Sequence, residues 1–216
     1  MSKLNVVYAC QECGWSSNKW MGRCSSCGEW DSMIEEKLKP SYTQKNSRFG
    51  NEKPVSLPDV KIVNKLRIST KIDEFDRILG GGIVIGSAIL IGGTPGIGKS
   101  TILLQVCQKI GEQGFISLYV TGEESTGQIK LRAERLSVTS KNIFLVAENN
   151  LHAIFEHIKD VKPKLIIIDS IQTMFNPDIG AVPGTISQVS QSTHELIYMA
   201  KKTGSSVFLA GHVTKQ

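Results

Sequence analysis

The 216-residue sequence lacks membrane-spanning, secretory and repetitive segments. No hydrophobic run approaches the roughly 18 residues of a membrane-spanning helix, and the N-terminal residues lack the long apolar region of a secretory signal peptide. Internal repeats and low-complexity tracts are also absent, which argues against a repeat or fibrous architecture. We therefore expect a globular cytoplasmic protein that has no membrane partner.

Acidic residues are scarce over one part of the chain, from Lys37 to Lys71. Only Glu52 and Asp59 oppose nine Lys and Arg residues there. The whole chain has a net charge of +5, which permits contact with nucleic acid without requiring it. Two interpretations of the basic stretch stay open, a solvated linker and an arm that follows the phosphates of a nucleic acid.

Apolar residues are few between residues 37 and 58, and this scarcity predicts a domain boundary. With 40% hydrophobic residues, the chain can bury one full core and carry a small additional module. The sequence thus predicts a module in residues 1–36, a basic polar linker in residues 37–58 and an α/β core in residues 59–216.

Four of the five cysteines stand in two Cys-x-x-Cys pairs. Cys10 and Cys13 form the first pair, and Cys24 and Cys27 form the second. Each pair can grip a metal ion from a tight turn, and two pairs complete a tetrahedral, structural zinc site. Redox dithiols or disulfides are the alternative. We expect the fifth cysteine, Cys107, to be a small buried hydrophobic residue.

Three tryptophans, Trp15, Trp20 and Trp30, accompany these pairs in the sequence. A module this small has little core of its own, so the favoured interpretation is that the rings pack around the metal. The alternative is that Trp20, together with Lys19 and Arg23, forms a surface on which bases stack and phosphates bind.

The most specific pattern is a phosphate-binding loop of the form Gly-x4-Gly-Lys-Ser. The apolar residues 87–91 predict a strand before the loop, and residues 101–107 predict a helix after it. In this order, backbone N–H groups and the helix N-terminus bind phosphate oxygens, and the lysine adds a mobile positive charge. The predicted nucleotide-binding residues are Gly93, Thr94, Pro95, Gly96, Ile97, Gly98, Lys99, Ser100 and Thr101.

Beyond this loop, short apolar segments alternate with segments of helical periodicity. Strands that are apolar on both faces and separated by helices are typical of a parallel sheet covered on both sides, so the predicted fold class is α/β. The expected strands are 66–70, 87–91, 115–120, 143–146, 165–168 and 207–210, and the expected helices are 72–79, 101–107, 125–136, 151–158 and 185–200. Ligands of such sheets bind at the carboxyl ends of the strands.

Polar residues follow two of these strands closely. Asp169 ends one strand, and we expect its carboxylate to hold the hydration shell of Mg²⁺ while Ser100 binds the ion directly. A helix cap is the alternative role for this aspartate. Glu123 and Glu124 follow another strand, where one carboxylate can accept a proton from an attacking water. Alternatively, both glutamates start the next helix, or one does so while the other acts as the base.

The last predicted strand is followed by the residues GHVTK. His212 or Thr214 can hydrogen-bond the γ-phosphate of a nucleotide and respond to its loss. The alternative is that the histidine makes only local contacts. These five residues alone do not decide between the two.

Several segments together resemble a known family. They are the two cysteine pairs, KWMGRC at 19–24, GGTPGIGKST at 92–101, TGEES at 121–125, IDSIQT at 168–173 and GHVTK at 211–215. The combination resembles the RadA/Sms DNA-repair family of RecA-like ATPases. The resemblance implies ATP hydrolysis, with Mg²⁺ and Zn²⁺ bound, coupled to movement on single-stranded or branched DNA during recombination. It also implies a ring-shaped homohexamer and recombination proteins as partners.

The same resemblance implies roles for single residues. These are phosphate and magnesium binding for Lys99, Ser100 and Thr101, catalytic base for Glu123, Walker B acid for Asp169 and sensor for His212. Residues 174–184 resemble the first DNA-binding loop of RecA-like proteins, although their Pro and Gly content alone indicates a mobile loop.

Members of that family continue with a Lys-Asn-Arg-Phe-Gly motif, the rest of the RecA-like core and a Lon-protease-like domain. The present sequence ends at Gln216, so we expect a C-terminally truncated form. A cation from a neighbouring subunit usually stabilises the transition state in such motors and raises the rate by about 10³ to 10⁵. Without the basic motif we expect nucleotide binding with weak turnover.

Two other functions stay open. The first is a phosphotransferase that passes the γ-phosphate to a small substrate, and the second is a nucleotide-binding assembly module without hydrolysis. An Arg-rich lid segment is missing from the sequence, and Glu123 suits a water better than a bound alcohol, so the phosphotransferase is the less favoured interpretation.

Overall fold

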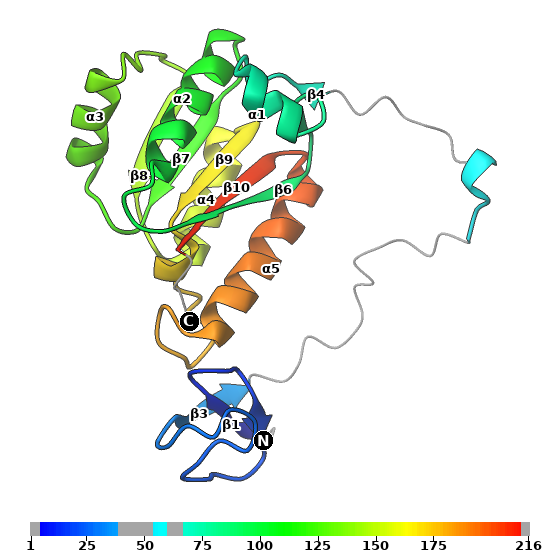
Figure 1. The fold of residues 1–216 in the computed structure, drawn as a ribbon, viewed down its shortest axis with the longest axis vertical. Coiled ribbons are helices and arrows are strands. Elements are labelled where there is room, and N and C mark those ends of the chain that lie inside the picture. Colours follow the sequence, from blue (N-terminus) through cyan, green and yellow to red (C-terminus); the bar gives the residue numbers. More distant parts are fainter. Residues whose placement is uncertain (1–4, 39–53, 60–66, 213–216) are drawn as a thin grey trace.

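The computed structural model describes residues 5–38, 54–59 and 67–212, which form an N-terminal module and an α/β core (Figure 1). The module is an antiparallel sheet of three strands in the order β2-β1-β3. These strands are β1 (Asn5–Cys10), β2 (Ser16–Ser17) and β3 (Met33–Leu38). Strand β3 pairs along the whole of β1, and its last two residues lie beyond the residue-36 boundary expected for this module. A short 3-10 helix, η1 (Leu57–Asp59), follows.

The core is built around five parallel strands in the order β6-β10-β9-β7-β8. They are β6 (Ala88–Gly93), β7 (Ser117–Thr121), β8 (Ile143–Ala147), β9 (Leu165–Asp169) and β10 (Ser206–His212). Two further strands, β4 (Arg67–Ile68) and β5 (Ile83–Val84), form a small antiparallel pair. The predicted α/β class with a parallel sheet is therefore confirmed.

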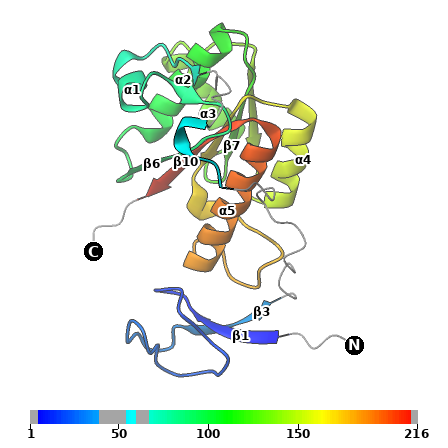
Figure 2. The same ribbon diagram turned by 90° about the vertical axis from the view of Figure 1, so that its right-hand side faces the viewer.

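Helices cover both faces of this sheet (Figures 1 and 2). They are α1 (Asp73–Ile78), α2 (Lys99–Glu112), α3 (Thr126–Arg135), α4 (Leu151–Val161) and α5 (Ile186–Thr203), and a 3-10 turn, η2 (Ile171–Thr173), follows β9. No helix in the described part of the chain is long and apolar enough to cross a membrane.

Alternation along the strands sends buried side chains to two separate clusters. On β7, Tyr119 joins the cluster formed with α2 and α3, whereas Leu118 and Val120 join the cluster formed with α4 and α5. Successive strand residues point to opposite faces, so both faces are apolar as the sequence indicated. Cys107 is fully buried in the first cluster, where burial raises the pKa of its thiol to about 12.

One glycine, Gly122, allows two segments to approach closely at the end of β7. Its N–H donates to the carbonyl of Asp169 at 2.9 Å. A Cβ added to it would lie 2.1 Å from Thr173 Oγ1 and 2.9 Å from Met174 Cε. The turn η2 therefore packs directly on the backbone of this glycine.

We predict that Gly122→Ala destabilises the core by about 1–3 kcal/mol, because the new methyl group forces η2 away from β7. Gly127→Ala is the matched control. A Cβ at Gly127, in the first turn of α3, meets only Ser125 Oγ at 3.8 Å. Alanine favours a helix over glycine, so this variant should gain up to about 1 kcal/mol. Denaturant unfolding measures both values, and equal stabilities would contradict the prediction.

Candidate functional site

The predicted phosphate-binding loop connects β6 to α2. Strand β6 ends at Gly93, and α2 begins at Lys99. Gly96 and Gly98 have φ angles of 78° and 102°, a region that side chains disfavour and glycine adopts freely. This conformation turns the chain from the strand into the helix and leaves the first N–H groups of α2 without partners in their own helix.

A cavity of about 320 Å³ lies at this loop. Its lining residues come from the loop and the start of α2, from the carboxyl ends of β7, β9 and β10, and from α3. They are Pro95, Gly96, Gly98, Lys99, Ser100, Thr101, Thr121, Glu123, Glu124, Arg132, Asp169 and His212. Gly93, Thr94 and Ile97 of the predicted loop do not line the cavity, and the Ile97 side chain is exposed. The strand ends thus gather most of the predicted nucleotide residues in one place.

The ammonium group of Lys99 is held by the loop itself. Its Nζ donates to the carbonyls of Gly93 and Thr94 at 2.8 and 3.1 Å, and it lies 3.2 Å from Nδ1 of His212. The lysine is buried. An incoming phosphate group would exchange these carbonyl contacts for ion pairs with the same ammonium group.

The two glutamates that follow β7 have different partners. Both carboxylate oxygens of Glu124 accept from Arg132 Nη2 at 2.8 Å, and this hydrogen bonding raises the pKa of Arg132. Glu123 instead accepts from Ser170 Oγ at 2.5 Å. Neither glutamate caps α3, because Ser125 does so in a reciprocal pair with Gln128. The interpretation that one glutamate starts this helix is therefore wrong.

His212 links the lysine to the first of these glutamates. Its Nε2 lies 3.3 Å from Glu123 Oε1. The Lys99 ammonium group can only donate, so Nδ1 of the ring accepts and the ring proton resides on Nε2. Gln172 Nε2 also donates to the backbone carbonyl of His212 at 3.2 Å. Thr214, the other residue considered for the sensor role, lies outside the described residues.

Asp169 ends β9 at the cavity and is paired with a buried phenol. Tyr119 donates its hydroxyl proton to Asp169 Oδ2 at 2.5 Å. Burial and the neighbouring carboxylate raise the pKa of this tyrosine well above its ordinary value, so the phenol stays protonated. A carboxylate beside the hydroxyl of Ser100 is a donor set that Mg²⁺ prefers, so the residues present fit the expected ion.

Sequence reasoning missed four participants in this region: Tyr119, Arg132, Ser170 and Gln172. Each residue lies in a segment that the sequence analysis singled out, but its hydrogen-bond partner is eight to fifty residues away in the chain. Only Tyr119 offers a hint in the sequence, because it is the one aromatic residue in the otherwise aliphatic middle of its strand.

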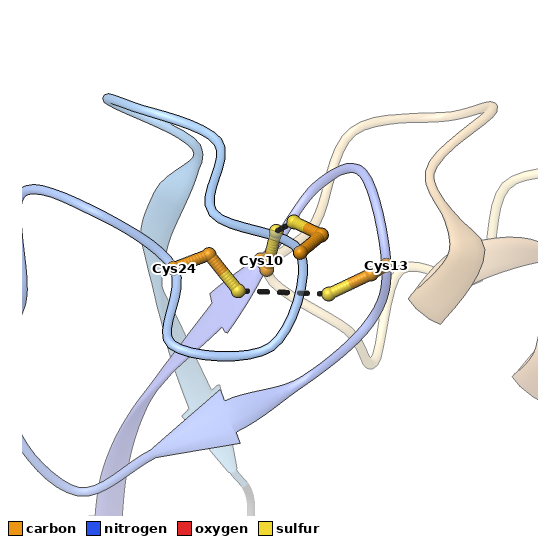
Figure 3. Close-up of side chains that lie close together, drawn as sticks. Cys10, Cys13 and Cys24 are labelled. Atoms are coloured by element: carbon orange, nitrogen blue, oxygen red, sulfur yellow. Dashed lines mark hydrogen bonds between the residues drawn. The ribbon is translucent and has the colours of Figure 1, made fainter.

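The four paired cysteines meet in the N-terminal module, and Figure 3 labels Cys10, Cys13 and Cys24 among them. Their sulfur atoms all lie within 4.8 Å of one another. The Cys10–Cys27 and Cys13–Cys24 sulfurs are each 3.6 Å apart. A tetrahedral zinc site, with Zn–S bonds of about 2.3 Å, places its sulfurs about 3.8 Å apart. The arrangement fits one zinc ion, and the five cysteines of the chain are free thiols, so disulfide pairing is not observed.

Hydrogen bonding favours thiolates at two of these positions. Burial raises the pKa of Cys10, but surrounding hydrogen bonds, first among them that with Ser32, outweigh it and lower the pKa to about 6. The backbone of Cys27 lowers the pKa of Cys24. Although the backbone of Glu29 favours the Cys27 thiolate, burial and the other thiols raise its pKa to about 12. A cation is needed to hold all four as thiolates, which is the state that zinc binds.

The prediction that the three tryptophans pack around the metal is wrong for two of them. Trp15 packs against the buried cysteines. Trp20 and Trp30 are 61% and 67% exposed, and the Arg23 guanidinium group lies 5.6 Å from the Trp30 ring. The module is too small to cover more than one large ring.

The loop of residues 174–184 is more firmly anchored than its Pro and Gly content indicated. Gln188 of α5, which is buried, donates to the carbonyls of Asn176 and Ala181 at 3.1 and 2.8 Å. Asp178 lies 3.0 Å from His152 of α4. Residues 176, 178 and 181 of the loop are therefore held by side chains of α4 and α5, whereas Val182 is exposed.

Most of the basic stretch between residues 37 and 71 falls on residues 39–53 and 60–66, which lie outside the described residues. Arg67 is described, and its Nη1 donates to the carbonyls of Leu79 and Gly82 at 2.9 and 3.1 Å. This arginine holds the turn between α1 and β5, so its role in the fold is structural.

Two family matches cover this chain. The rubredoxin metal binding domain matches residues 8–35, and the AAA domain matches residues 51–216. The chain belongs to the AAA domain family. The first match covers all four paired cysteines, so the predicted zinc-ribbon module is confirmed together with the α/β core.

The relatives are named DNA repair protein RadA. That of Streptococcus pyogenes serotype M6 is 48% identical over 218 residues, that of Chlamydia muridarum 45% over 214 and that of Bacillus subtilis 41% over 221. These alignments cover 99–100% of this chain and 47–48% of each relative. The predicted resemblance to the RadA family is confirmed, and the chain spans about half the length of these relatives.

We predict that the chain contains one zinc ion, which Cys24→Ser removes or greatly weakens, because three thiolates no longer close a tetrahedral site. Cys107→Ala is the matched control, since this thiol lies in the core, in the buried cluster formed with α2 and α3. Metal content measured by atomic absorption after dialysis tests both variants. Full zinc content in Cys24→Ser, or loss in Cys107→Ala, would contradict the assignment.

A second prediction concerns the loop lysine. Lys99→Ala should weaken nucleotide binding by about 10- to 100-fold or more, because a charge-assisted contact to phosphate is lost. Lys109→Ala, on the same helix but paired with Glu112 at the exposed end, should bind as the unmodified chain does. Fluorescent-nucleotide titration measures both affinities, and equal values would exclude the loop as the phosphate site.

Proposed function

We propose that this chain binds ATP with Mg²⁺ at the β6–α2 loop and hydrolyses it, as the ATPase part of a DNA-repair protein. The observation that carries the proposal is the meeting of Lys99, Glu123, Asp169 and His212 around one cavity. Phosphoryl transfer to water requires a cation, a carboxylate base, a carboxylate that holds the metal ion and a group that senses the γ-phosphate. The four residues would fill these roles in the order given, and the carboxylate proposed as the base is not ion-paired to an arginine.

Phosphate binding is assigned to the loop and the start of α2. The unpartnered N–H groups there, with the positive end of the helix dipole, attract anions. Lys99 already points into the loop through its contacts with Gly93 and Thr94. In the proposed complex, the ammonium group turns to the β- and γ-phosphates.

Magnesium is assigned to the oxygens of Ser100 and Asp169, the first as a direct ligand and the second through water. The ion would neutralise negative charge on the phosphates when it is bound. The two residues lie on α2 and at the end of β9, and both line the cavity. Asp169 takes part in none of the ion pairs found in the described residues.

Glu123 is the proposed base, in preference to Glu124. A base must be able to accept a proton from water, and both oxygens of Glu124 already accept from Arg132. Among the residues that the structure describes, the Glu123 carboxylate has polar contacts with Ser170 and His212, and its side chain is 47% exposed. The ring of His212 joins this carboxylate to Lys99, so it can respond to the γ-phosphate that the lysine holds.

A second cavity provides room for the remainder of the nucleotide. It has a volume of about 550 Å³ and runs along α3. Its lining residues are Glu124, Gln128, Leu131, Arg132, Glu134 and Arg135. Glu124 and Arg132 also line the first cavity, so the two are adjacent. The exposed Leu131 offers an apolar surface of the kind that nucleobases cover.

The DNA-related part of the proposal is supported by the relatives, each of which is named a DNA repair protein. We propose that DNA, single-stranded or branched, stimulates hydrolysis, that residues 174–184 contact it and that the active form is a homohexamer working with recombination proteins. We also propose that the chain is divided into a zinc module in residues 1–36, a basic linker in residues 37–58 and a RecA-like core in residues 59–216. A phosphotransferase is less favoured, because Glu123 is open to water.

We predict that phosphate release from ATP rises when single-stranded DNA is added, and that Glu123→Gln lowers it by about 10²-fold or more while nucleotide binding persists. Glu156→Gln, an exposed residue paired with Lys159 on α4, lines neither cavity and is the control that should keep its activity. Single-turnover assays with protein in excess detect slow hydrolysis.

Each outcome separates the candidate functions. Hydrolysis that depends on DNA supports the motor. ADP formed only when a small acceptor is added supports the phosphotransferase. Nucleotide binding without phosphate release, with or without DNA, supports the assembly module and overturns the proposed ATPase.

A further inference from the structure

Tyr119 is a buried phenol in a position where packing alone requires only a ring. It lies in the middle of β7, its side chain is fully buried, and it faces α2. Its neighbours on the strand, Leu118 and Val120, are aliphatic. A buried hydroxyl group needs hydrogen-bond partners, so the choice of a tyrosine here has to be explained by what its oxygen contacts.

The phenol oxygen contacts one of the two residues assigned to magnesium. Its hydroxyl group donates to Asp169 Oδ2 at 2.5 Å. Ser100, the other assigned residue, lines the same cavity as Asp169. A phenol has a single proton, and that proton goes to the carboxylate, so the hydrogen bond engages one of the two oxygens of Asp169.

This hydrogen bond fixes the orientation of the Asp169 carboxylate. Tyr119 holds one of the two carboxylate oxygens. The other oxygen is left for the water shell of the ion.

We propose that Tyr119 is the positioning residue that orients Asp169 for the divalent cation bound with the nucleotide. The inference rests on the proposed nucleotide site. Partners that orient the ligands of a metal usually contribute 10- to 100-fold to its affinity. Tyr119 does not touch the nucleotide, so its effect should appear in the dependence on Mg²⁺ and not in binding without the ion.

The test compares Tyr119→Phe, which removes only the hydroxyl, with the unmodified chain. Affinity for a fluorescent ATP analogue is measured in EDTA and then across a Mg²⁺ titration. We expect unchanged affinity in EDTA and a Mg²⁺ midpoint about tenfold higher or more. Ser117→Ala is the control, because it removes a buried hydroxyl from the same strand at its far end from the cavity; its midpoint should not move.

Three results would overturn the inference: an unchanged Mg²⁺ midpoint in Tyr119→Phe, an equal shift in Ser117→Ala, or a loss of affinity in EDTA that marks a packing role. Failure of the proposed function looks different. In that case the unmodified chain itself fails to bind the nucleotide in EDTA and in Mg²⁺ alike.

Discussion

The parallel pairing of the central strands is the constraint on which the candidate site depends. Gly93 of β6 is in register with His212 of β10, and Thr121 of β7 is in register with Asp169 of β9. Parallel strands end at the same edge of a sheet, so residues separated by more than a hundred positions become neighbours. Burial of both faces fixes this register, because a shift of one residue would send every side chain to the opposite face. The apolar clusters thereby position the polar cavity.

The sequence predicted those parts whose geometry is set locally. A glycine-rich loop between a strand and a helix, and two cysteine pairs, carry their spacing within a few residues, and both occur in the structure as expected. Side-chain pairs across the fold were not predictable in this way. The contact of Glu124 with Arg132, and that of Glu123 with Ser170, depends on the register of strands and on helix orientation. Trp20 and Trp30 show the same limit, since their exposure follows from the size of the module and not from their hydrophobicity.

The two parts of the chain reach stability by different means. The core buries two large apolar clusters, one on each face of its sheet. Among the described residues of the module, the buried cluster consists of Cys10, Cys24 and Met33. Hydrophobic burial of this extent does not offset the entropy of ordering the chain. Metal coordination therefore supplies much of the folding free energy of the module, and folding and zinc binding are coupled there.

The turn η2 touches the candidate site at two points. Ser170, just before it, holds the carboxylate of Glu123, and Gln172 within it holds the backbone of His212. The anchored loop of residues 174–184 begins directly after this turn. The same turn therefore connects that loop, through one hydrogen bond each, to Glu123 and His212, the proposed base and sensor. A displacement of the loop would act on both residues through this single turn, which couples the loop to the cavity.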